Sequence, residues 1–192
     1  TNIEPIADNG TVTLGSSGDT FTVPSGVTVN MSSATQTGVG GANTPAFDAR
    51  ASSNQTGLTS GGWTKVQFDT ELFDVGGGYD ATNDKFVVPS GEAGKYFFTT
   101  FAKINSAGGS ATLLGTGMRF NKNGSNVKES IHFIANGSNS AEGKGVNCVL
   151  DLAVSDYIEV YAYYQDNGGG TGSITGSSDF DTFFTGFKLI GA

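Results

Sequence analysis

The sequence has only one cysteine, Cys148, and one histidine, His132, among its 192 residues. A single cysteine excludes a framework of disulfides within the chain, so crosslinks cannot compensate for a small core. One cysteine and one histidine also fall short of the ligands that a zinc site usually takes from these residue types. The fold must therefore be stabilised by packing and hydrogen bonding.

Basic residues and long apolar runs are scarce as well. Lys and Arg total 10 against 18 Asp and Glu, the net charge is −8, and no cluster of Lys or Arg occurs. Because a phosphate backbone or an anionic membrane surface attracts clustered cations, we expect neither as a partner, and nucleic-acid binding is excluded. No apolar run approaches the roughly 20 residues that span a bilayer, so membrane insertion is not expected either.

Gly, Ser, Thr and Asn take up about 44% of the chain, in place of residues that favour helices. These four residue types are unfavourable in helix interiors, which excludes an all-α fold. Disorder is excluded by the 14 Phe, 6 Tyr and 1 Trp, which bury too much surface for an unfolded chain. The composition therefore predicts an all-β protein rich in turns.

Strand-like segments fill the chain from Pro45 onward. They are rich in aromatic and β-branched residues, turns with Gly, Pro or Asn separate them, and no helical period lies between them. The strongest hairpin signal is Asn123-Gly124, because this dipeptide adopts the positive φ values of a type I′ turn. This spacing indicates one sandwich or closed barrel. The predicted strands are 46–51, 64–69, 85–88, 95–105, 112–121, 127–134, 145–154, 157–165 and 182–190.

Residues 1–44 differ from the rest of the chain. Three short alternating runs, at 11–14, 20–23 and 27–31, each offer about two apolar side chains on one face. Ribbons this small do not fold alone, because so little burial cannot offset the cost of ordering the chain. The segment is therefore either a stalk that intertwines with other copies in an oligomer or a flexible tether. Its end, 35–43, has the composition of a linker.

Aromatic side chains fall on both faces of the predicted strand 95–105. Tyr96 and Phe98 face one way, and Phe97 and Phe101 face the other. One of these faces belongs in the core of the sandwich, and in a monomer the other would lie in water. Because a large exposed apolar patch usually marks an interface, the pattern predicts an oligomer.

The spacing of several residues points to one family. Phe68, Asp74, Tyr79 and Phe86 follow one another with five, four and six residues between them, and Gly94-Lys95-Tyr96-Phe97-Phe98 comes next. This order resembles the signature of complement C1q-like globular heads, which have the jelly roll of tumour necrosis factor. Stretches similar to the family's other strands continue in chain order through residues 45–192.

The resemblance implies a two-sheet jelly-roll sandwich at 45–192 and a homotrimer whose inner sheets pack about a three-fold axis. The gap from Phe86 to Gly94 is two residues longer than in the family pattern. Thr100 also stands where an aromatic residue is usual, so we expect a β-bulge there or an aromatic side chain supplied from elsewhere. The residues at family-like positions of the core or the trimer interface are Phe47, Phe68, Tyr79, Phe86, Tyr96, Phe98, Tyr161, Phe184 and Phe187.

Acidic residues gather around the turn Gly76–Gly78. The cluster consists of Glu71, Asp74, Asp80 and Asp84, and its simplest interpretation is a soluble loop. Asp74, Asp80 and Asp84 are also candidate ligands for Ca²⁺, because oxygen ligands on loops suit that ion. We expect no other cofactor. A less favoured alternative is a glycan hydrolase that uses paired carboxylates of this cluster.

The remaining reactive groups receive structural interpretations. His132 has only Glu129 nearby in the sequence, and a general base needs a positioned partner. Cys148 shares its strand face with apolar residues and is expected to be a small buried thiol. A second possible cation site, at Asp166, Asp179 and Asp181, flanks a Gly-rich loop at 167–178.

No catalytic constellation emerges, so we expect a non-enzymatic protein. A Ser-, Thr- and Gly-rich stalk with a compact trimeric head resembles phage and bacterial appendage proteins, and the style of residues 22–28 is typical of phage structural proteins. We hypothesise a homotrimeric virion component (fibre, knob or capsid decoration) that attaches to other virion proteins through residues 1–44. Its head would bind a host-surface ligand, such as a glycan or a protein; the alternative is a secreted or surface bacterial recognition domain. The loop positions expected to bind ligand are Trp63, Tyr79, Asn167 and Thr171.

Overall fold

The computed structural model describes residues 18, 20, 22–29, 43–108, 110–134, 139–177 and 182–189. The chain divides into two compact units, residues 1–39 and residues 40–192. The described residues contain strands and no α-helix, which confirms the all-β prediction. The strands are β1 (Ala46–Arg50), β2 (Gln55–Thr59), β3 (Gly62–Lys65), β4 (Thr70–Val75), β5 (Tyr79–Asp80), β6 (Lys85–Val87), β7 (Gly94–Asn105), β8 (Leu113–Lys122), β9 (Ser125–Phe133), β10 (Ala141–Leu152), β11 (Tyr157–Asp166), β12 (Thr171–Thr175) and β13 (Phe183–Lys188).

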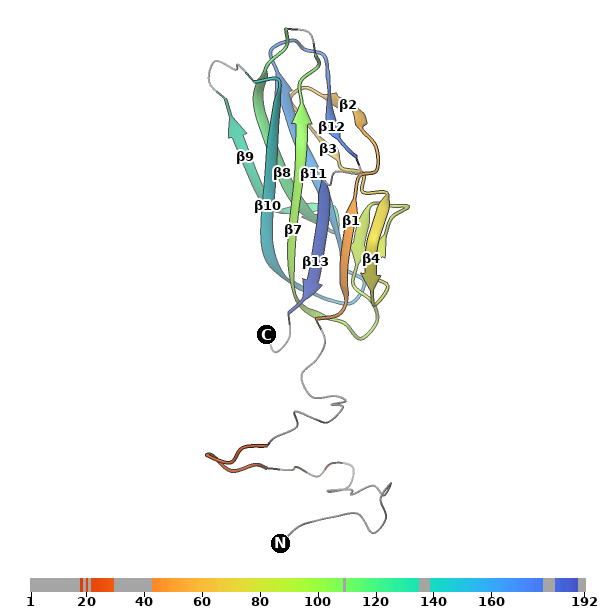
Figure 1. Ribbon diagram of the computed structural model, residues 1–192, viewed down its shortest axis with the longest axis vertical. Helices are drawn as coiled ribbons and strands as arrows, with labels where there is room; N and C mark the ends of the chain where they lie inside the picture. The colour runs from red at the N-terminus through yellow and green to blue at the C-terminus, as the bar shows by residue number, and fades with distance from the viewer. Residues whose placement is uncertain are drawn as a thin grey trace. The chain divides into compact units, whose positions relative to one another are not determined.

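The strands form two antiparallel sheets, as expected for a jelly-roll sandwich (Figure 1). The first, called the β7 sheet, has the order β2-β12-β7-β13-β1-β4, and β10 pairs with the other edge of β7. The second, called the β11 sheet, has the order β5-β6-β11-β8-β9, and β3 also pairs with β11. Within the described ranges there is no helix with the length and apolar character to cross a membrane.

The core between the two sheets is built mainly from aromatic rings. Phe47 stacks on Tyr79 at 4.9 Å and on Phe86 at 5.1 Å between ring centroids, and the edge of Phe184 meets Phe47 at 4.8 Å. Such offset and edge-to-face pairs add to the free energy gained by burying the rings. Seven of the nine predicted core or interface aromatics are buried here: Phe47, Phe68, Tyr79, Phe86, Tyr96, Phe98 and Phe184. The other two, Tyr161 and Phe187, lie on the outward faces of the β11 sheet and the β7 sheet.

Strand β7 keeps one register along its whole length. It pairs with β10 from Gly94 to Asn105 and with β13 from Tyr96 to Phe101, without a shift in either pairing. The β-bulge considered near Thr100 is therefore absent. The Thr100 hydroxyl donates a hydrogen bond to the Phe183 carbonyl at 2.8 Å, and Phe184, directly opposite Thr100 on β13, supplies an aromatic ring to the core.

Four strands form where none was expected. These are β2, β4, β5 and β12, and β12 lies inside the predicted loop 167–178, so that prediction was partly wrong. β12 is held by pairing with β2 on one edge and with β7 on the other. Its sequence, TGSIT, has little strand character, so its conformation depends on these long-range neighbours. The predicted strand 64–69 was also too long, because β3 ends at Lys65.

Of the first unit, the described residues include a turn at residues 24–27. The Val27 amide donates to the Pro24 carbonyl at 3.3 Å, and Gly26 takes a φ of +84°, which suits glycine in a turn. No strand forms within 22–29, in contrast to the expected runs at 20–23 and 27–31. Most of the predicted stalk or tether lies outside the described residues and stays a prediction.

The connection between β10 and β11 is tied to the β8–β9 hairpin by one carboxylate. Asp156 forms an ion pair with Lys122 at 2.7 Å, and it accepts hydrogen bonds from the Asn123 side chain at 2.7 Å and the Ala153 amide at 2.8 Å. These contacts favour the charged form and lower the pKa of Asp156 to about 2, with the hydrogen bond from Lys122 as the largest cause.

We predict that replacing Phe184 by alanine destabilises the fold by about 3–5 kcal/mol, because the ring leaves a cavity among five aromatic neighbours. The free energy of unfolding would be measured by urea denaturation at fixed protein concentration. As a control, Phe133→Ala removes a side chain that is 61% exposed and should cost less than about 1 kcal/mol. Equal losses for the two variants would contradict this account of the core.

Because the pKa of Asp156 is lowered in the folded protein, we predict that the free energy of unfolding falls in acid. Its folded pKa of about 2 lies below the usual value of about 3.9, so its contribution is complete above about pH 4 and is lost as the pH falls toward 2. Thermal melts between pH 7 and pH 2 should therefore show a steeper fall in midpoint for the unaltered protein than for Asp156→Asn. Parallel curves for the two proteins would show that Asp156 is not linked to folding.

Candidate functional site

The outward face of the β7 sheet carries three rows of side chains that cross five strands. In each row the residues are direct cross-strand neighbours, so their side chains lie on one face. Read from β4 through β1, β13 and β7 to β10, the first row is Val75, Ala46, Phe187, Phe97 and Val149, the second is Phe73, Asp48, Thr185, Thr99 and Asn147, and the third is Thr70, Arg50, Phe183, Phe101 and Gly145.

The first row of this face is wholly apolar, and the other two rows mix apolar with polar side chains. Phe97 and Phe187 lie 5.5 Å apart between ring centroids in the first row, and Phe101 stacks on Phe183 at 6.3 Å in the third. Apolar side chains remain in contact with water at its edges, with Phe73 47% and Val149 53% exposed. An apolar surface of this extent on a sheet face marks a protein interface more often than a free surface.

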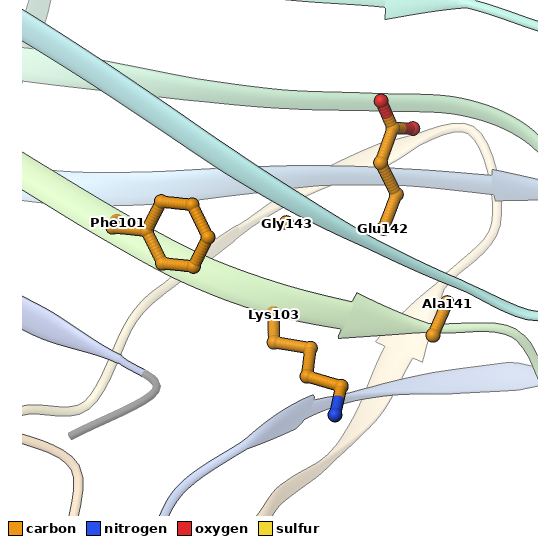
Figure 2. Close-up of a pocket in the computed structure, with 5 residues that line it drawn as sticks. All are labelled: Phe101, Lys103, Ala141, Glu142 and Gly143. Atoms are coloured by element: carbon orange, nitrogen blue, oxygen red, sulfur yellow. The ribbon is translucent and has the colours of Figure 1, made fainter. Parts of the chain in front are cut away.

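Two shallow hollows interrupt the face. One, of about 280 Å³, is lined by Phe101, Lys103, Ala141, Glu142 and Gly143. Figure 2 shows Lys103 and Glu142 extending in opposite directions from neighbouring strands beside the Phe101 ring. Position 143 carries glycine, and a Cβ atom there would clash with the Phe101 ring in its present position.

The second hollow, of about 260 Å³, is lined by Asp48, Leu72, Phe183 and Thr185. Burial raises the pKa of the Asp48 carboxyl above its usual value, since the charged form loses hydration. A complementary protein surface could insert side chains into both hollows. Lys103 and Glu142 of the first hollow point in opposite directions, so they do not form an acid–base pair there.

The outward face of the β11 sheet has a different chemistry. Trp63 of β3 lies 5.4 Å from Tyr163 of β11, and the edge of Phe133 of β9 meets Tyr163 at 6.1 Å between centroids. The guanidinium of Arg119 on β8 lies 4.4 Å from the Trp63 ring centre and 5.2 Å from that of Tyr161. We call these five residues the aromatic strip. Contacts of this kind hold a cation against the faces of aromatic rings.

Polar groups border the aromatic strip. Lys65 and Glu159 form an ion pair at 2.6 Å beside Tyr161, and the Tyr163 hydroxyl donates to Gln165 at 3.0 Å. The strip therefore alternates ring surface with hydrogen-bonding groups. The sequence singled out Trp63 but gave no signal for Arg119, which comes from a strand distant in the chain.

The other predicted ligand-binding positions are separated from Trp63. Tyr79 is only 7% exposed, and its hydroxyl donates to the Phe68 carbonyl at 2.9 Å, so the prediction of an exposed position was wrong for this residue. Burial, followed by the nearby Asp84 charge, raises the pKa of Tyr79 well above its usual value. Asn167 and Thr171 are exposed, but they lie beyond the end of β11, past the strand pair that holds Trp63.

The carboxylates around the glycine turn are used one by one in local structure. Asp74 accepts from the amides of residues 78 and 79 at 3.1 Å each, Asp80 bonds to Asn83 at 2.8 and 3.0 Å, and Asp84 accepts from the Phe68 amide at 2.8 Å. Among the residues that the structure describes, no group of three or more His, Cys, Asp or Glu side chains could hold a metal ion. Asp74, Asp80 and Asp84 therefore do not form the predicted calcium site, and with Glu71 they line neither hollow.

The second predicted cation site can be placed only in part. The Asp166 carboxylate accepts hydrogen bonds from the Gly169 amide at 3.0 Å and the Ala107 amide at 3.3 Å, so it closes the turn after β11. Asp179 and Asp181 lie outside the described residues.

The lone histidine and the lone cysteine have structural surroundings. His132 Nδ1 lies 3.2 Å from one oxygen of Glu142, and the other oxygen accepts from the Thr116 hydroxyl at 2.7 Å. This carboxylate links β8, β9 and β10, and the sequence gave no sign of it because Glu142 follows His132 by ten residues. Cys148 points inward opposite Phe98, and burial raises its pKa to about 11, so the thiol stays protonated and poorly nucleophilic.

Comparisons with known proteins agree with this architecture. The globular domain of zebrafish complement 1qA has 16% identity and a TM-score of 0.52, and covers 76% of this chain and 97% of its own. Murine APRIL at pH 5.0 has 15% identity and a TM-score of 0.55, covering 75% and 98%. Eiger TNF from S. frugiperda has 9% identity and a TM-score of 0.51, covering 75% and 91%. At these identities the similarity shows the fold.

The family is shown by the sequence itself. No curated protein matches the chain. The family model of the C1q domain, however, matches residues 46–189, which include every strand of both sheets. Domains of this kind form trimers and are in general non-enzymatic binding modules. The chain belongs to the C1q domain family.

Proposed function

We propose that this chain is a non-enzymatic, homotrimeric structural and recognition protein whose subunits meet through the outward face of the β7 sheet. The observation that carries the proposal is the set of phenylalanines on that face, with Phe97 against Phe187 and Phe101 against Phe183. Phenylalanine has no polar atom, so these rings gain nothing from water and are stabilised when another protein surface covers them.

The family supports a trimer as the assembly that covers this face. The inner sheets of three C1q-like heads would pack about a three-fold axis, and the Phe97 row is the most apolar part of the face. The hollow at Asp48 and the hollow at Phe101 would receive side chains of neighbouring copies. An isolated subunit would leave this apolar surface exposed, which favours association or aggregation.

We place the trimer on a virion, as a fibre, knob or capsid decoration anchored through residues 1–44 to other virion proteins. The support for this placement is the Ser-, Thr- and Gly-rich N-terminal segment, which resembles those of phage structural proteins. The head would then present its remaining surface to a host ligand. Immunogold labelling of purified virions with antibodies against the head tests the placement, and an absence of label on intact particles would contradict it.

The trimer itself is tested by mass and by one substitution. We expect light scattering to give about three times the subunit mass of 19.7 kDa. Phe97→Asp places a charge in the middle of the apolar row, so it should shift the protein to the monomer mass, with a β-type circular dichroism spectrum retained. Phe133→Asp makes the same change on the opposite face and should leave the trimer intact. A monomeric unaltered protein, or dissociation caused by Phe133→Asp alone, would refute the proposed interface.

A further inference from the structure

We propose that the aromatic strip is a binding site for a saccharide that carries a carboxylate, such as a uronic or sialic acid residue. Arg119 would receive the carboxylate, and the rings of Trp63 and Tyr163 would pack against the apolar face of the sugar. The inference rests on the proposed function, because a trimer built on the β7 sheet leaves the β11 sheet facing outward.

The residues of the aromatic strip lie on paired strands, and this pairing fixes the positions of their side chains relative to one another. Trp63 lies directly opposite Tyr163 in the pairing of β3 with β11, and Arg119 lies directly opposite Tyr161 in the pairing of β8 with β11. Phe133 joins from β9, opposite Gly115 on β8. Four neighbouring strands therefore present these side chains on one face, and sites built on strands are positioned more accurately than sites on loops.

The two outward faces differ in a way that selects different partners. The first row of the β7 sheet presents phenylalanine, alanine and valine, whose side chains have no polar atoms and suit a protein surface that excludes water. The aromatic strip presents tryptophan and tyrosine, whose N–H and O–H groups need hydrogen-bond partners at the wet side of a contact. Gln165 and Glu159 border the same rings. A pyranose ring combines an apolar face with hydroxyl groups around its rim, so it matches this alternation of ring surface and polar atoms.

Arg119 is the group that selects an acidic sugar. Of its neighbours on the same face, Lys65 forms an ion pair with Glu159, and Glu129, directly across on β9, accepts a hydrogen bond from the Asn126 side chain at 2.7 Å. In the described part of the chain Arg119 contacts two rings but forms no ion pair, and its Nε is buried without a hydrogen-bond partner. A guanidinium held in place by rings and lacking a carboxylate is suited to bind one from a ligand through two parallel hydrogen bonds.

Trp63 makes the test direct, because it is the only tryptophan of the chain. The trimer would be titrated with 3′-sialyllactose, with trigalacturonic acid and with neutral lactose, following Trp63 fluorescence and the heat of binding. We expect at least one acidic sugar to give a saturable response, with an affinity at least tenfold higher than that of lactose. Saturation with lactose at equal affinity, or no response to either acidic sugar, would overturn the proposal.

Substitutions assign the response to the strip. Arg119→Gln should weaken binding of the acidic sugar at least tenfold and leave the weak response to lactose unchanged. The matched control is Lys85→Gln, which removes a cation 5.1 Å from the ring of Tyr157 on the same sheet but outside the strip. This control should bind as the unaltered protein does. Equal losses in both variants would mean that overall charge, rather than Arg119, attracts the ligand.

Light scattering on the same samples separates this inference from the proposed function. A trimer that binds neither acidic sugar refutes the saccharide site and leaves the trimer proposal standing. A monomer that binds acidic sugar through Arg119 refutes the proposed assembly and leaves the site standing. If Arg119→Gln breaks the trimer, the strip is a subunit interface and the saccharide proposal is wrong.

Discussion

The alternation of side chains along β7 is the constraint on which both the core and the outer surface depend. Because β7 pairs with β10 over its full length and keeps its register with β13, its residues must alternate between the core and the outside. Tyr96 and Phe98 are thereby committed to the core, and Phe97 and Phe101 to the outward face. A slip of one residue would exchange these two sets. The stability of the fold and the apolar character of the outward face therefore come from the same pairing.

The parts of the fold that the sequence could predict are those in which each strand carries its own signal. The long strands β7, β8, β10 and β11 were expected close to their observed positions, and the family signature supplied the arrangement of the sheets. β2 and β12 were missed because residues such as Gly57 and Gly172 have no strand preference of their own. These strands exist because β12 pairs with β2 on one edge and with β7 on the other, and such pairing depends on the tertiary structure.

Of the aromatic strip, the sequence analysis named only Trp63 as a candidate ligand-binding residue. Trp63 stood out as the only tryptophan, whereas Arg119 joins it through a strand more than fifty residues away. Tyr79 was predicted both as a ligand-binding loop position and as a core position, and its buried ring and its hydroxyl, which donates to a backbone carbonyl, agree with the second prediction only. The carboxylates near it suggested a metal site, but Asp74 accepts from backbone amides of its own turn and Asp84 accepts from the more distant Phe68 amide. Hydrogen bonds from backbone amides to carboxylates cannot be recognised from the spacing of acidic residues in the sequence.

The inward position of Cys148 has a practical consequence. The only thiol of the chain lies against Phe98 with a pKa raised to about 11, so at neutral pH almost none of it is present as the reactive thiolate. A cysteine introduced at an exposed position, with an ordinary pKa, would react with a thiol-specific probe well before Cys148 does. Spin labels or fluorophores can therefore be attached to either sheet face without first removing the natural cysteine.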